Sequence, residues 1–313
     1  SSRRRHTRYG TVTGVQTCAL PILLVEYNTG YKITETMPSH VYGFKSHRDH
    51  YAIDFDEARL KNRINELVNF SNNEPDYAKK YDLGAWNYKL AAKELAKQDN
   101  YLENLYLCAY RPFDNRFMFY SNLVMDRIRP ELKQHIFKKR NLCLICSRQI
   151  STLKYRHFFV TNLVPNDCLI SNITKESNHN FPLYLYPDID QLQSSLFTSD
   201  QVKTNLSKEF LAAIKQKLGY LPTPEAIFYY IYAIFHSPTY RQRYGEFLKI
   251  DFPRVPLTSN QQLFQDLGEK GQELVELHLM QSPKLNKFIT KISGGGDNAD
   301  RKSTRLNSSH SSV

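Results

Sequence analysis

Residues 104–121 read NLYLCAYRPFDNRFMFYS and consist of two aromatic and aliphatic runs on either side of a proline turn. Such runs are typical of β-strands, and the turn RPFDN at 111–115 indicates a hairpin or a strand corner. Three more runs of the same kind follow, NLCLICS (141–147), RHFFVT (156–161) and FPLYLY (181–186). We therefore expect an aromatic, β-rich central region at 105–187.

Helical patterns surround this region. The apolar spacing from Asp56 to Phe70, with Asp56 as N-cap, predicts an amphipathic helix, and a second helix is expected at 83–97. Inside the region, Arg129-Pro130 predicts a short helix that ends near residue 139. The pattern as a whole predicts an α+β fold with a β-rich centre flanked by helical segments.

Helix-start signals recur after the central region. Thr223-Pro224-Glu225 supplies an N-cap, a first-turn proline and an acid, and Ser237-Pro238 starts a helix expected to run to residue 248. The prolines of DFPRVP (251–256) predict an extended segment. A last helix is expected at 261–280, with an apolar stripe made of Leu263, Leu267, Leu274 and Leu277.

The charge of the chain favours a polyanionic partner, nucleic acid first. The 313 residues carry a formal net charge of +11, from 42 Lys and Arg against 31 Asp and Glu. Both ends look foreign to the fold, because 12–22 and 301–309 resemble translated sequencing-adapter sequence. Residues 1–22 contribute +4 and residues 297–313 contribute +1, so +6 remains for 23–296. We expect the chain to be a fragment that begins inside a larger protein.

Other classes of protein are less compatible with the composition. No stretch approaches the ~18 uninterrupted apolar residues of a membrane span, so no membrane partner is expected. Five cysteines, an odd and sparse number, favour a reducing, cytoplasmic setting without disulfides. Cys143 and Cys146 have CxxC spacing but lie in an apolar strand pattern without a second ligand pair, which favours buried core over zinc.

Several strings that stand in order resemble the C-terminal specificity region of Type ISP restriction-modification enzymes and related adenine methyltransferase-endonucleases. They are YRPFDNR (110–116), FPLYLYP (181–187), TPEAIFYYIYAIFHSPTYRQRYGEFLKIDFPRVP (223–256) and LGEKGQELVELHLM (267–280). GFKSHRDHYAIDFD (43–56) resembles the short Arg-Asp motif that precedes the recognition region in that family. The resemblance covers nearly all of residues 25–281.

The resemblance implies the target recognition domain of an N6-adenine DNA methyltransferase, with double-stranded DNA as partner. In that family one polypeptide also carries a nuclease, a translocase and the methyltransferase. We find no Asn/Asp-Pro-Pro-Tyr/Phe motif, no glycine-rich cofactor loop and no phosphate-binding loop, so we expect no catalysis from this chain alone. By resemblance, S-adenosylmethionine, ATP and Mg²⁺ belong to the parent enzyme, and no cofactor is expected in this fragment.

These observations divide the chain into five expected parts. They are an adapter-like segment (1–22), a helical segment at the methyltransferase edge (23–104), a β-rich recognition core (105–187), a helical C-terminal part (188–283) and a flexible, largely artefactual tail (284–313). Two other functions stay open. The chain can belong to a methyltransferase-endonuclease that is active only with its missing N-terminal domains, or it can be a protein–protein scaffold for the translocase.

A target recognition domain needs cations for phosphates, and Arg, Asn or Gln for base edges. Arg116, Arg148 and Gln149 lie beside or after strands and are the candidates for base reading. The full set of predicted DNA contacts is Arg48, Arg111, Asn115, Arg116, Arg127, Arg129, Lys138, Lys139, Arg140, Arg148, Gln149, Arg241, Arg243 and Arg254. No catalytic or metal-binding residue is predicted.

Structural alternatives exist for most of these residues. YRPFDNR can be a structural corner in which Asp114 pairs with an arginine and Phe113 fills the core. The cations of 137–141 can complement the C-terminal dipole of the preceding helix. The tyrosines of 229–244 can be helix core. Asp76 with Glu131 and Lys133 formally resembles a restriction-nuclease pattern, but the gap is long and Glu131 falls in a helix.

Overall fold

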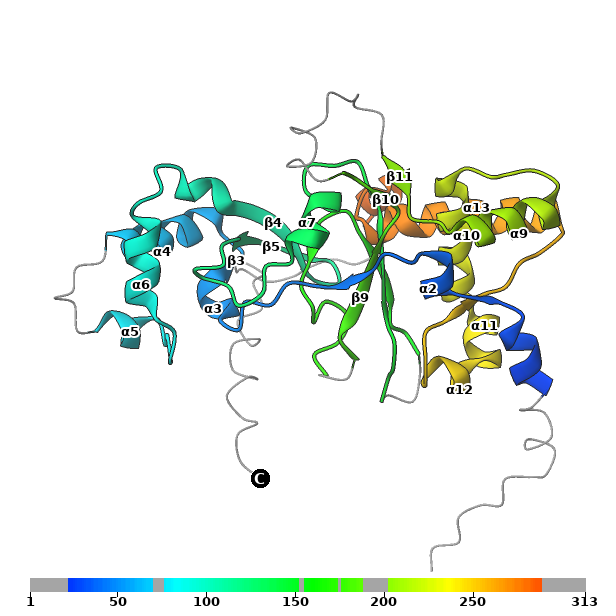
Figure 1. The fold of residues 1–313 in the computed structure, drawn as a ribbon, viewed down its shortest axis with the longest axis horizontal. Coiled ribbons are helices and arrows are strands. Elements are labelled where there is room, and N and C mark those ends of the chain that lie inside the picture. The colour runs from blue at the N-terminus through cyan, green and yellow to red at the C-terminus, as the bar shows by residue number, and fades with distance from the viewer. Residues whose placement is uncertain (1–21, 70–75, 152–154, 174–175, 188–201, 289–313) are drawn as a thin grey trace, which may run out of the picture.

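The computed structural model of the chain describes residues 22–69, 76–151, 155–173, 176–187 and 202–288. Within these ranges, a central sheet stands between two groups of helices (Figure 1). One group contains α4 (Glu57–Val68) and α6 (Tyr88–Leu95), and the other contains α9 (Lys208–Leu218), α10 (Pro224–His236) and α13 (Gln261–His278). The expected α+β class is therefore confirmed. The adapter-like runs, apart from residue 22, lie outside the described residues.

The central sheet has the strand order β2-β9-β6-β7, and all neighbouring strands are antiparallel. Its strands are β2 (Val41–Tyr42), β9 (Asn178–Pro182), β6 (Cys143–Ser147) and β7 (Phe158–Thr161). Every residue of β6 is buried, because alternate side chains enter cores on opposite faces of the sheet. Cys146 belongs to one core and Cys143 to the other, and both are free thiols. Their interpretation as core residues is confirmed.

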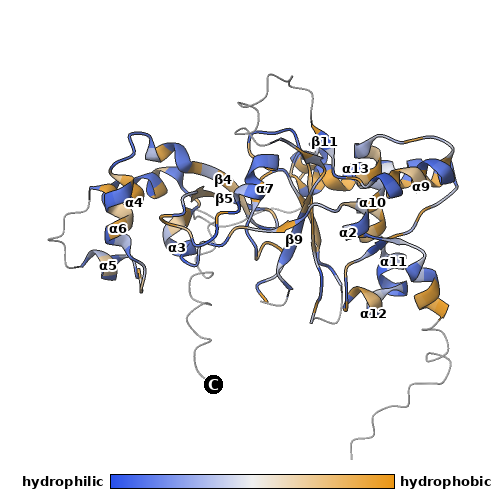
Figure 2. Ribbon diagram, in the orientation of Figure 1, coloured by the Kyte–Doolittle hydropathy of each residue, from blue (hydrophilic) through white to orange (hydrophobic). Residues whose placement is uncertain are grey.

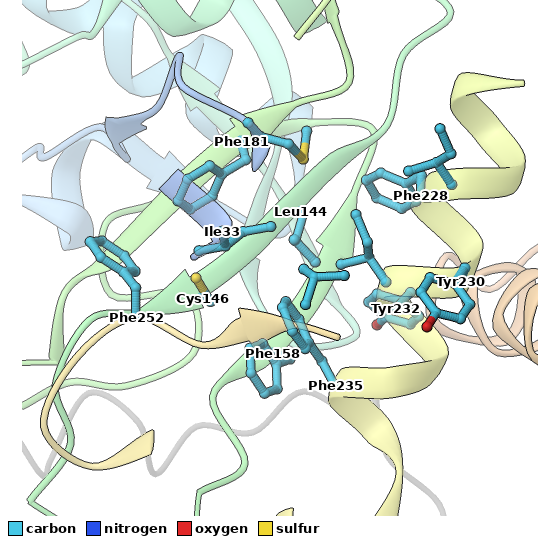
Figure 3. Close-up of a cluster of buried hydrophobic side chains, with 14 of the residues drawn as sticks. Ile33, Leu144, Cys146, Phe158, Phe181, Phe228, Tyr230, Tyr232, Phe235 and Phe252 are labelled. Atoms are coloured by element: carbon cyan, nitrogen blue, oxygen red, sulfur yellow. The ribbon is translucent and has the colours of Figure 1, made fainter. Parts of the chain in front are cut away.

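The larger core lies between the central sheet and α10 (Figure 3). The α10 helix begins as predicted, since the Thr223 side chain accepts a hydrogen bond from the Ala226 amide. α13 crosses α10 so closely that a β-carbon at Gly271 would overlap the carbonyl oxygen of Tyr229. Tyr230 and Tyr232 are buried in this core. Their interpretation as helix core, in place of a stacking surface, is confirmed.

The second sheet, in the order β3-β5-β4-β8, supports the N-terminal helices. Its strands are β3 (Ile53–Asp54), β5 (Asp114–Phe119), β4 (Leu105–Arg111) and β8 (Val164–Pro165). β4 and β5 form the predicted hairpin. Phe113 in its turn has a φ of 62°, in the left-handed region that bulky residues rarely adopt, and is 55% exposed. It therefore does not fill the core, because the turn directs it outward, where its ring contacts Phe159 and His278.

Several element boundaries differ from the predicted ones. The helix expected at 83–97 begins only at Tyr88, because Gly84 has a positive φ and Asn87 caps the Leu90 amide. The helix expected at 238–248 is divided into α11 (Pro238–Arg243) and α12 (Gly245–Leu248), since Tyr244 leaves the helical conformation. α7 (Pro130–Ile136) ends three residues early, where Lys138 has a φ of 53°.

Two apolar patterns were predicted correctly only in part, since Leu267 and Leu274 of the α13 stripe pack against the core but Leu263 does not. α13 buries Phe264, Gly271 and Val275, whereas Leu263 is 44% exposed, because the close approach at Gly271 sets which face of the helix meets α10. The run 181–186 contributes to two strands, β9 and β10 (Tyr184–Leu185), and β10 pairs with β11 (Lys203–Thr204). The periodicity of the run does not predict the break between β9 and β10.

Residues near the start of the described chain form strands that pair with two distant parts of the sequence. β1 (Tyr31–Lys32) pairs with β12 (Arg254–Val255), within the segment predicted to be extended, and β2 provides the edge strand beside β9. Hydrophobic residues concentrate in the strands and the inner helices, whereas α7 and the segments near α3 (Asp49–Ala52) are largely hydrophilic (Figure 2). In the described part of the chain, no helix is long and apolar enough to cross a membrane.

Candidate nucleic-acid interface

A basic depression opens beside the edge of the central sheet, with a volume of about 320 Å³. Segments far apart in the sequence build it: β2 and the residues after it, the turn before α7, the segment after β6, and the start of β9. Its lining consists of Tyr42, Lys45, Arg127, Arg129, Arg148, Gln149, Ser177 and His179. Four of the predicted DNA contacts, Arg127, Arg129, Arg148 and Gln149, are thus brought together.

Arg148 and Gln149 are exposed neighbours in this lining, as is Arg127. β6 is wholly buried up to Ser147, and Ile150 is buried again, so the chain presents two exposed side chains between two buried residues. The Arg148 side chain is 59% exposed, and its Nε donates to Asp251 at 3.1 Å. Because an exposed ion pair contributes only ~0 to 1 kcal/mol, Arg148 can exchange this carboxylate for an acceptor on a ligand.

Lys45, Arg127 and Arg129 surround the depression with further positive charge. The backbones of Lys45 and Arg127 exchange hydrogen bonds, which fixes the two side chains next to each other. Lys45 pairs with the buried Asp167 at 2.8 Å, and Arg129 lies 3.5 Å from Glu131. The partner carboxylates are not part of the lining, so the depression itself presents cations.

Arg129 is held in an unfavourable backbone conformation. Its φ is 56° and its ψ is 62°, in the left-handed region, although it is the residue before the α7 proline. Among the residues that the structure describes, its buried Nε has no hydrogen-bond partner. Strain of this kind costs of order 1 kcal/mol or more.

Aromatic rings close one side of the depression. The rings of Tyr42 and His179 lie 4.4 Å apart between centroids, and His40 contacts His179 from behind. Burial, together with the smaller effects of the neighbouring His40 and Arg148, lowers the pKa of His179 to about 4. His179 is therefore neutral near pH 7, and the positive charge of the depression comes from lysine and arginine.

The predicted contacts in the β4–β5 turn have internal partners. Arg116 donates from Nε and Nη2 to Asp114, and its guanidinium lies between the rings of Phe55 and Tyr110, at 3.8 and 4.1 Å from their centroids. The Arg111 guanidinium also lies over the Tyr110 ring, 4.0 Å from its centroid, and donates to the Asn166 side chain. The pairing of Asp114 that the structural alternative predicted is confirmed. Asn115, by contrast, is exposed.

Other predicted contacts also bind the protein itself. Arg48 donates to the carbonyl oxygens of Ser46 and Val124 and lies over Trp86, and burial lowers its pKa. Arg241 donates to the Phe235 carbonyl, and Arg254 donates to that of Gly30. The exposed Arg243 pairs with Glu26 at 2.5 Å. Their role in DNA binding remains a prediction, but their guanidinium groups already serve the fold.

A second group of exposed cations follows α7. Lys138, Lys139 and Arg140 are all exposed, and Lys139 and Arg140 line a separate depression of about 480 Å³ beside α10 and α13. The ammonium of Lys139 lies 5.1 Å from the Tyr186 ring centroid. These residues stand directly after the C-terminus of α7, so they fit both the helix-dipole interpretation and phosphate contact.

The nuclease-like pattern does not form a site. Glu131 pairs with Arg129, and Lys133 points its ammonium at the rings of Tyr106 and Tyr120, at 4.3 Å from each centroid. Over the described residues, no group of three His, Cys, Asp or Glu could hold a metal ion. His47 faces Asp126, and His135 accepts from the Tyr186 amide, so neither has a catalytic companion in this geometry.

Sequence reasoning missed half of the lining of the basic depression. Lys45 lies in the GFKSHRDH string that was singled out, but its short distance from Arg127 depends on an isolated β-bridge. Tyr42 and His179 lie on two strands that pair across 137 residues of sequence, and Ser177 directly precedes the second of them. The periodicity of either segment gives no signal for such a pairing.

Residues 35–312 match the family described as the Type ISP C-terminal specificity domain. Among solved structures, the chain is similar to a DrdV–DNA complex, with 20% identity and a TM-score of 0.59 over 78% of this chain and 23% of that chain. It is also similar to a nuclease-deletion mutant of the Type ISP restriction-modification enzyme LlaGI in complex with a DNA substrate mimic, with 19% identity and a TM-score of 0.56 over 81% and 23%.

A further similar structure is the ATP-dependent Type ISP restriction-modification enzyme LlaBIII bound to DNA, with 20% identity and a TM-score of 0.58 over 81% of this chain and 16% of that chain. At such identities the likeness shows a shared fold. The chain spans less than a quarter of the length of each of these solved chains. No curated protein sequence is a significant match.

Proposed function

Because the chain belongs to the Type ISP C-terminal specificity domain family, we propose that it recognises a specific sequence in double-stranded DNA through the basic depression. One observation carries the proposal: Arg148 and Gln149 are presented side by side at this depression, on a rigid strand end, among further cations. The solved structures that share its fold are described as DNA complexes, which supports the same partner for this chain.

The chemistry of the two exposed side chains suits base reading. The guanidinium of arginine matches the two acceptors of guanine in the major groove, and the amide of glutamine matches the donor and acceptor of adenine. Arg148 and Gln149 therefore form the direct-readout element. Their position after a buried strand limits their motion, which favours discrimination between bases over nonspecific attraction.

The remaining cations suit the phosphate backbone. Lys45, Arg127 and Arg129 surround the reading pair, and Lys138, Lys139 and Arg140 extend the positive surface beyond α7. Contacts of this kind fix the register of the duplex and carry no sequence information. The aromatic wall made by Tyr42 and His179 adds a neutral surface for the sugar or base edge.

The finer part of the proposal concerns the parent enzyme. The module presents its target adenine to an N6-adenine methyltransferase domain, and S-adenosylmethionine, ATP and Mg²⁺ act in the methyltransferase, translocase and nuclease domains outside this chain. The proposed setting is the cytoplasm, where the DNA lies. Adenine methylation at the bound motif, obtained only when the preceding domains are joined to this chain, is the expected result.

A binding selection from randomised duplex DNA tests the DNA-reading proposal. The full chain is used at near-physiological salt and again at raised salt, because the basic ends attract any DNA and lose this attraction as salt increases. We expect one short motif to be enriched under both conditions. Recovery of a pool without a shared sequence would contradict sequence reading by this chain. Enrichment of the same motif by an Arg148→Ala, Gln149→Ala double variant would place the reading elsewhere.

A further inference from the structure

The reading pair Arg148 and Gln149 is held from both sides by hydrogen bonds to the residues next to it. Before it, the Ser147 carbonyl accepts from the Tyr155 hydroxyl at 3.0 Å, and the Ser147 hydroxyl donates to the carbonyl oxygen of Glu176 at 2.5 Å. After it, the Ile150 amide donates to the carbonyl oxygen of Lys249 at 3.2 Å. Segment 147–151 therefore has fixed ends while its two central side chains stay exposed.

The side chain of Glu176 provides the last of these attachments. Its Oε1 accepts from the Ser151 amide at 2.6 Å and from the Ser151 hydroxyl at 2.7 Å. Its Oε2 accepts from the Ser171 hydroxyl at 2.7 Å and lies 3.0 Å from His157 Nε2. Glu176 thus connects the end of segment 147–151 to residues beyond it in the chain.

Glu176 is wholly buried, although it is a carboxylate. Burial by itself would raise its pKa, but the hydrogen bonds from Ser151 and Ser171 and the neighbouring His157 outweigh burial and lower the pKa to about 2. A buried charge is costly unless it is hydrogen-bonded, and a well-satisfied one fixes the geometry of its donors. The next residue, Ser177, belongs to the lining of the basic depression.

We propose that Glu176 is a positioning residue for sequence recognition: its carboxylate fixes segment 147–151 so that Arg148 and Gln149 meet base edges in one geometry. This inference rests on the proposed DNA-reading function. Glu176 touches no DNA itself, so its contribution passes through Gln149 and Arg148. Loosening the segment leaves the proposed phosphate contacts of Lys45 and Arg127 in place. It therefore lowers affinity for the preferred sequence far more than affinity for any other sequence.

The test compares two duplexes, the one enriched by the selection and a shuffled version of it, for the full chain and its variants. Glu176→Gln keeps the shape of the side chain but gives it one acceptor oxygen in place of two. We expect affinity for the enriched duplex to fall at least about tenfold, and affinity for the shuffled duplex to change less than about twofold. Thermal unfolding of each variant establishes that binding is measured on folded protein.

Two serine variants provide matched controls. Ser151→Ala and Ser171→Ala each remove one hydroxyl donor to Glu176, but only Ser151 belongs to the segment that carries the reading pair. We expect Ser151→Ala to reduce discrimination between the two duplexes and Ser171→Ala to leave it nearly unchanged. This comparison also serves as the test if Glu176→Gln does not fold.

Combining Glu176→Gln with loss of the reading pair separates positioning from simple loss of stability. In a Gln149→Ala, Arg148→Ala background, Glu176→Gln should cost little further discrimination, because the side chains it positions are gone. Two results would overturn the inference while leaving the proposed function intact. One is that Glu176→Gln lowers affinity equally for both duplexes. The other is that Glu176→Gln costs as much discrimination in the Arg148→Ala, Gln149→Ala background as in the wild type. A wild-type chain that binds both duplexes equally would instead overturn the proposed function, and the inference with it.

Discussion

Two arginine-rich regions of the molecule, the β4–β5 turn and the basic depression, use the same residue type for different purposes. In the turn, Arg116 is enclosed by Asp114, Phe55 and Tyr110. In the depression, Arg148 is 59% exposed and pairs with one partly exposed carboxylate, that of Asp251, which Lys32 also contacts. The first arginine is part of the structure, and the second is available to a partner.

The difference arises from where the partners of each arginine lie in the sequence. Asp114 is two residues from Arg116 on the same strand, so both side chains point to the same face of the sheet and meet without any tertiary contact. Asp251 is 103 residues from Arg148 and reaches it only across the folded chain. An acid two residues away on the same strand therefore favours a structural arginine over a DNA-reading one, although the Phe55 ring reaches Arg116 only across the fold.

Replacement of Arg116 is expected to cause the largest loss of stability. Arg116→Ala removes a bidentate charge-assisted pair and two ring contacts and leaves Asp114 unpaired, so we expect the free energy of unfolding to fall by about 2–3 kcal/mol. Urea denaturation measures this loss, with the exposed neighbour Asn115→Ala as control at less than about 0.5 kcal/mol. An Arg116→Ala protein of normal stability that no longer selects a DNA motif would assign Arg116 to DNA reading.

The depression is tested by Gln149→Ala. This side chain is exposed, so we expect the free energy of unfolding to change by less than about 0.5 kcal/mol. Binding to the enriched duplex should weaken by about 1–3 kcal/mol, and binding to the shuffled duplex should stay nearly constant. Fluorescence anisotropy with both duplexes makes the measurement. An equal loss on both would show that Gln149 serves general attraction.

Stability should also depend on pH through His179, which lines the depression. The unfolded chain protonates His179 near the ordinary pKa of 6.5, whereas the folded protein does so near 4, where burial is the main cause. The stability due to neutral His179 is therefore complete above about pH 6.5 and is lost as the pH falls towards 4. We expect a slope of at most about 1.4 kcal/mol per pH unit from this residue.

Urea unfolding at pH 7, 6 and 5 measures this slope in the wild type and in His179→Phe. The variant keeps a ring against Tyr42 but has no proton to take up, so its stability should depend less steeply on pH. Slopes that agree between the two proteins would show that acid acts through other buried groups, such as His236, whose pKa burial lowers to about 3.

The smallest expected effect concerns Lys139, which lies in neither region. Lys139→Ala should weaken binding to every duplex alike, by less than about 1 kcal/mol, and should reduce the slope of log K against log salt by about 0.9 if one phosphate contact is lost. Titrations at several salt concentrations measure the slope. An unchanged slope would leave Lys139 with its helix-terminal role alone.

Much of the fold could be predicted from local patterns. The β4–β5 hairpin, the α4 cap at Asp56 and the α10 cap at Thr223 depend on residues within a few positions of each other, and all three are confirmed. The buried face of α13 was predicted wrongly at Leu263. The face of α13 that is buried depends on the close approach of Gly271 to Tyr229 on α10. The periodicity of α13 alone does not predict this contact.

The candidate site was predicted in part for the same reason. Arg127, Arg129, Arg148 and Gln149 could be named because each residue type suits DNA, but nothing local separated them from Arg116 or Arg48. Lys45 and His179 joined them only through strand pairing, and Glu176 only through a buried network. Which cation remains free for a ligand is settled by the distribution of distant carboxylates, rings and carbonyl oxygens.

By itself the sequence determined the α+β class, the family resemblance, the excess of positive charge and the elements whose caps and turns lie close together along the chain. The tertiary structure alone decided which arginines are enclosed and which are exposed, and which residues line the basic depression. The physical reason is that helix caps and hairpin turns form between neighbours in sequence. Burial and ion pairing depend on contacts across the fold, where one distant side chain can satisfy a charge or leave it to a partner.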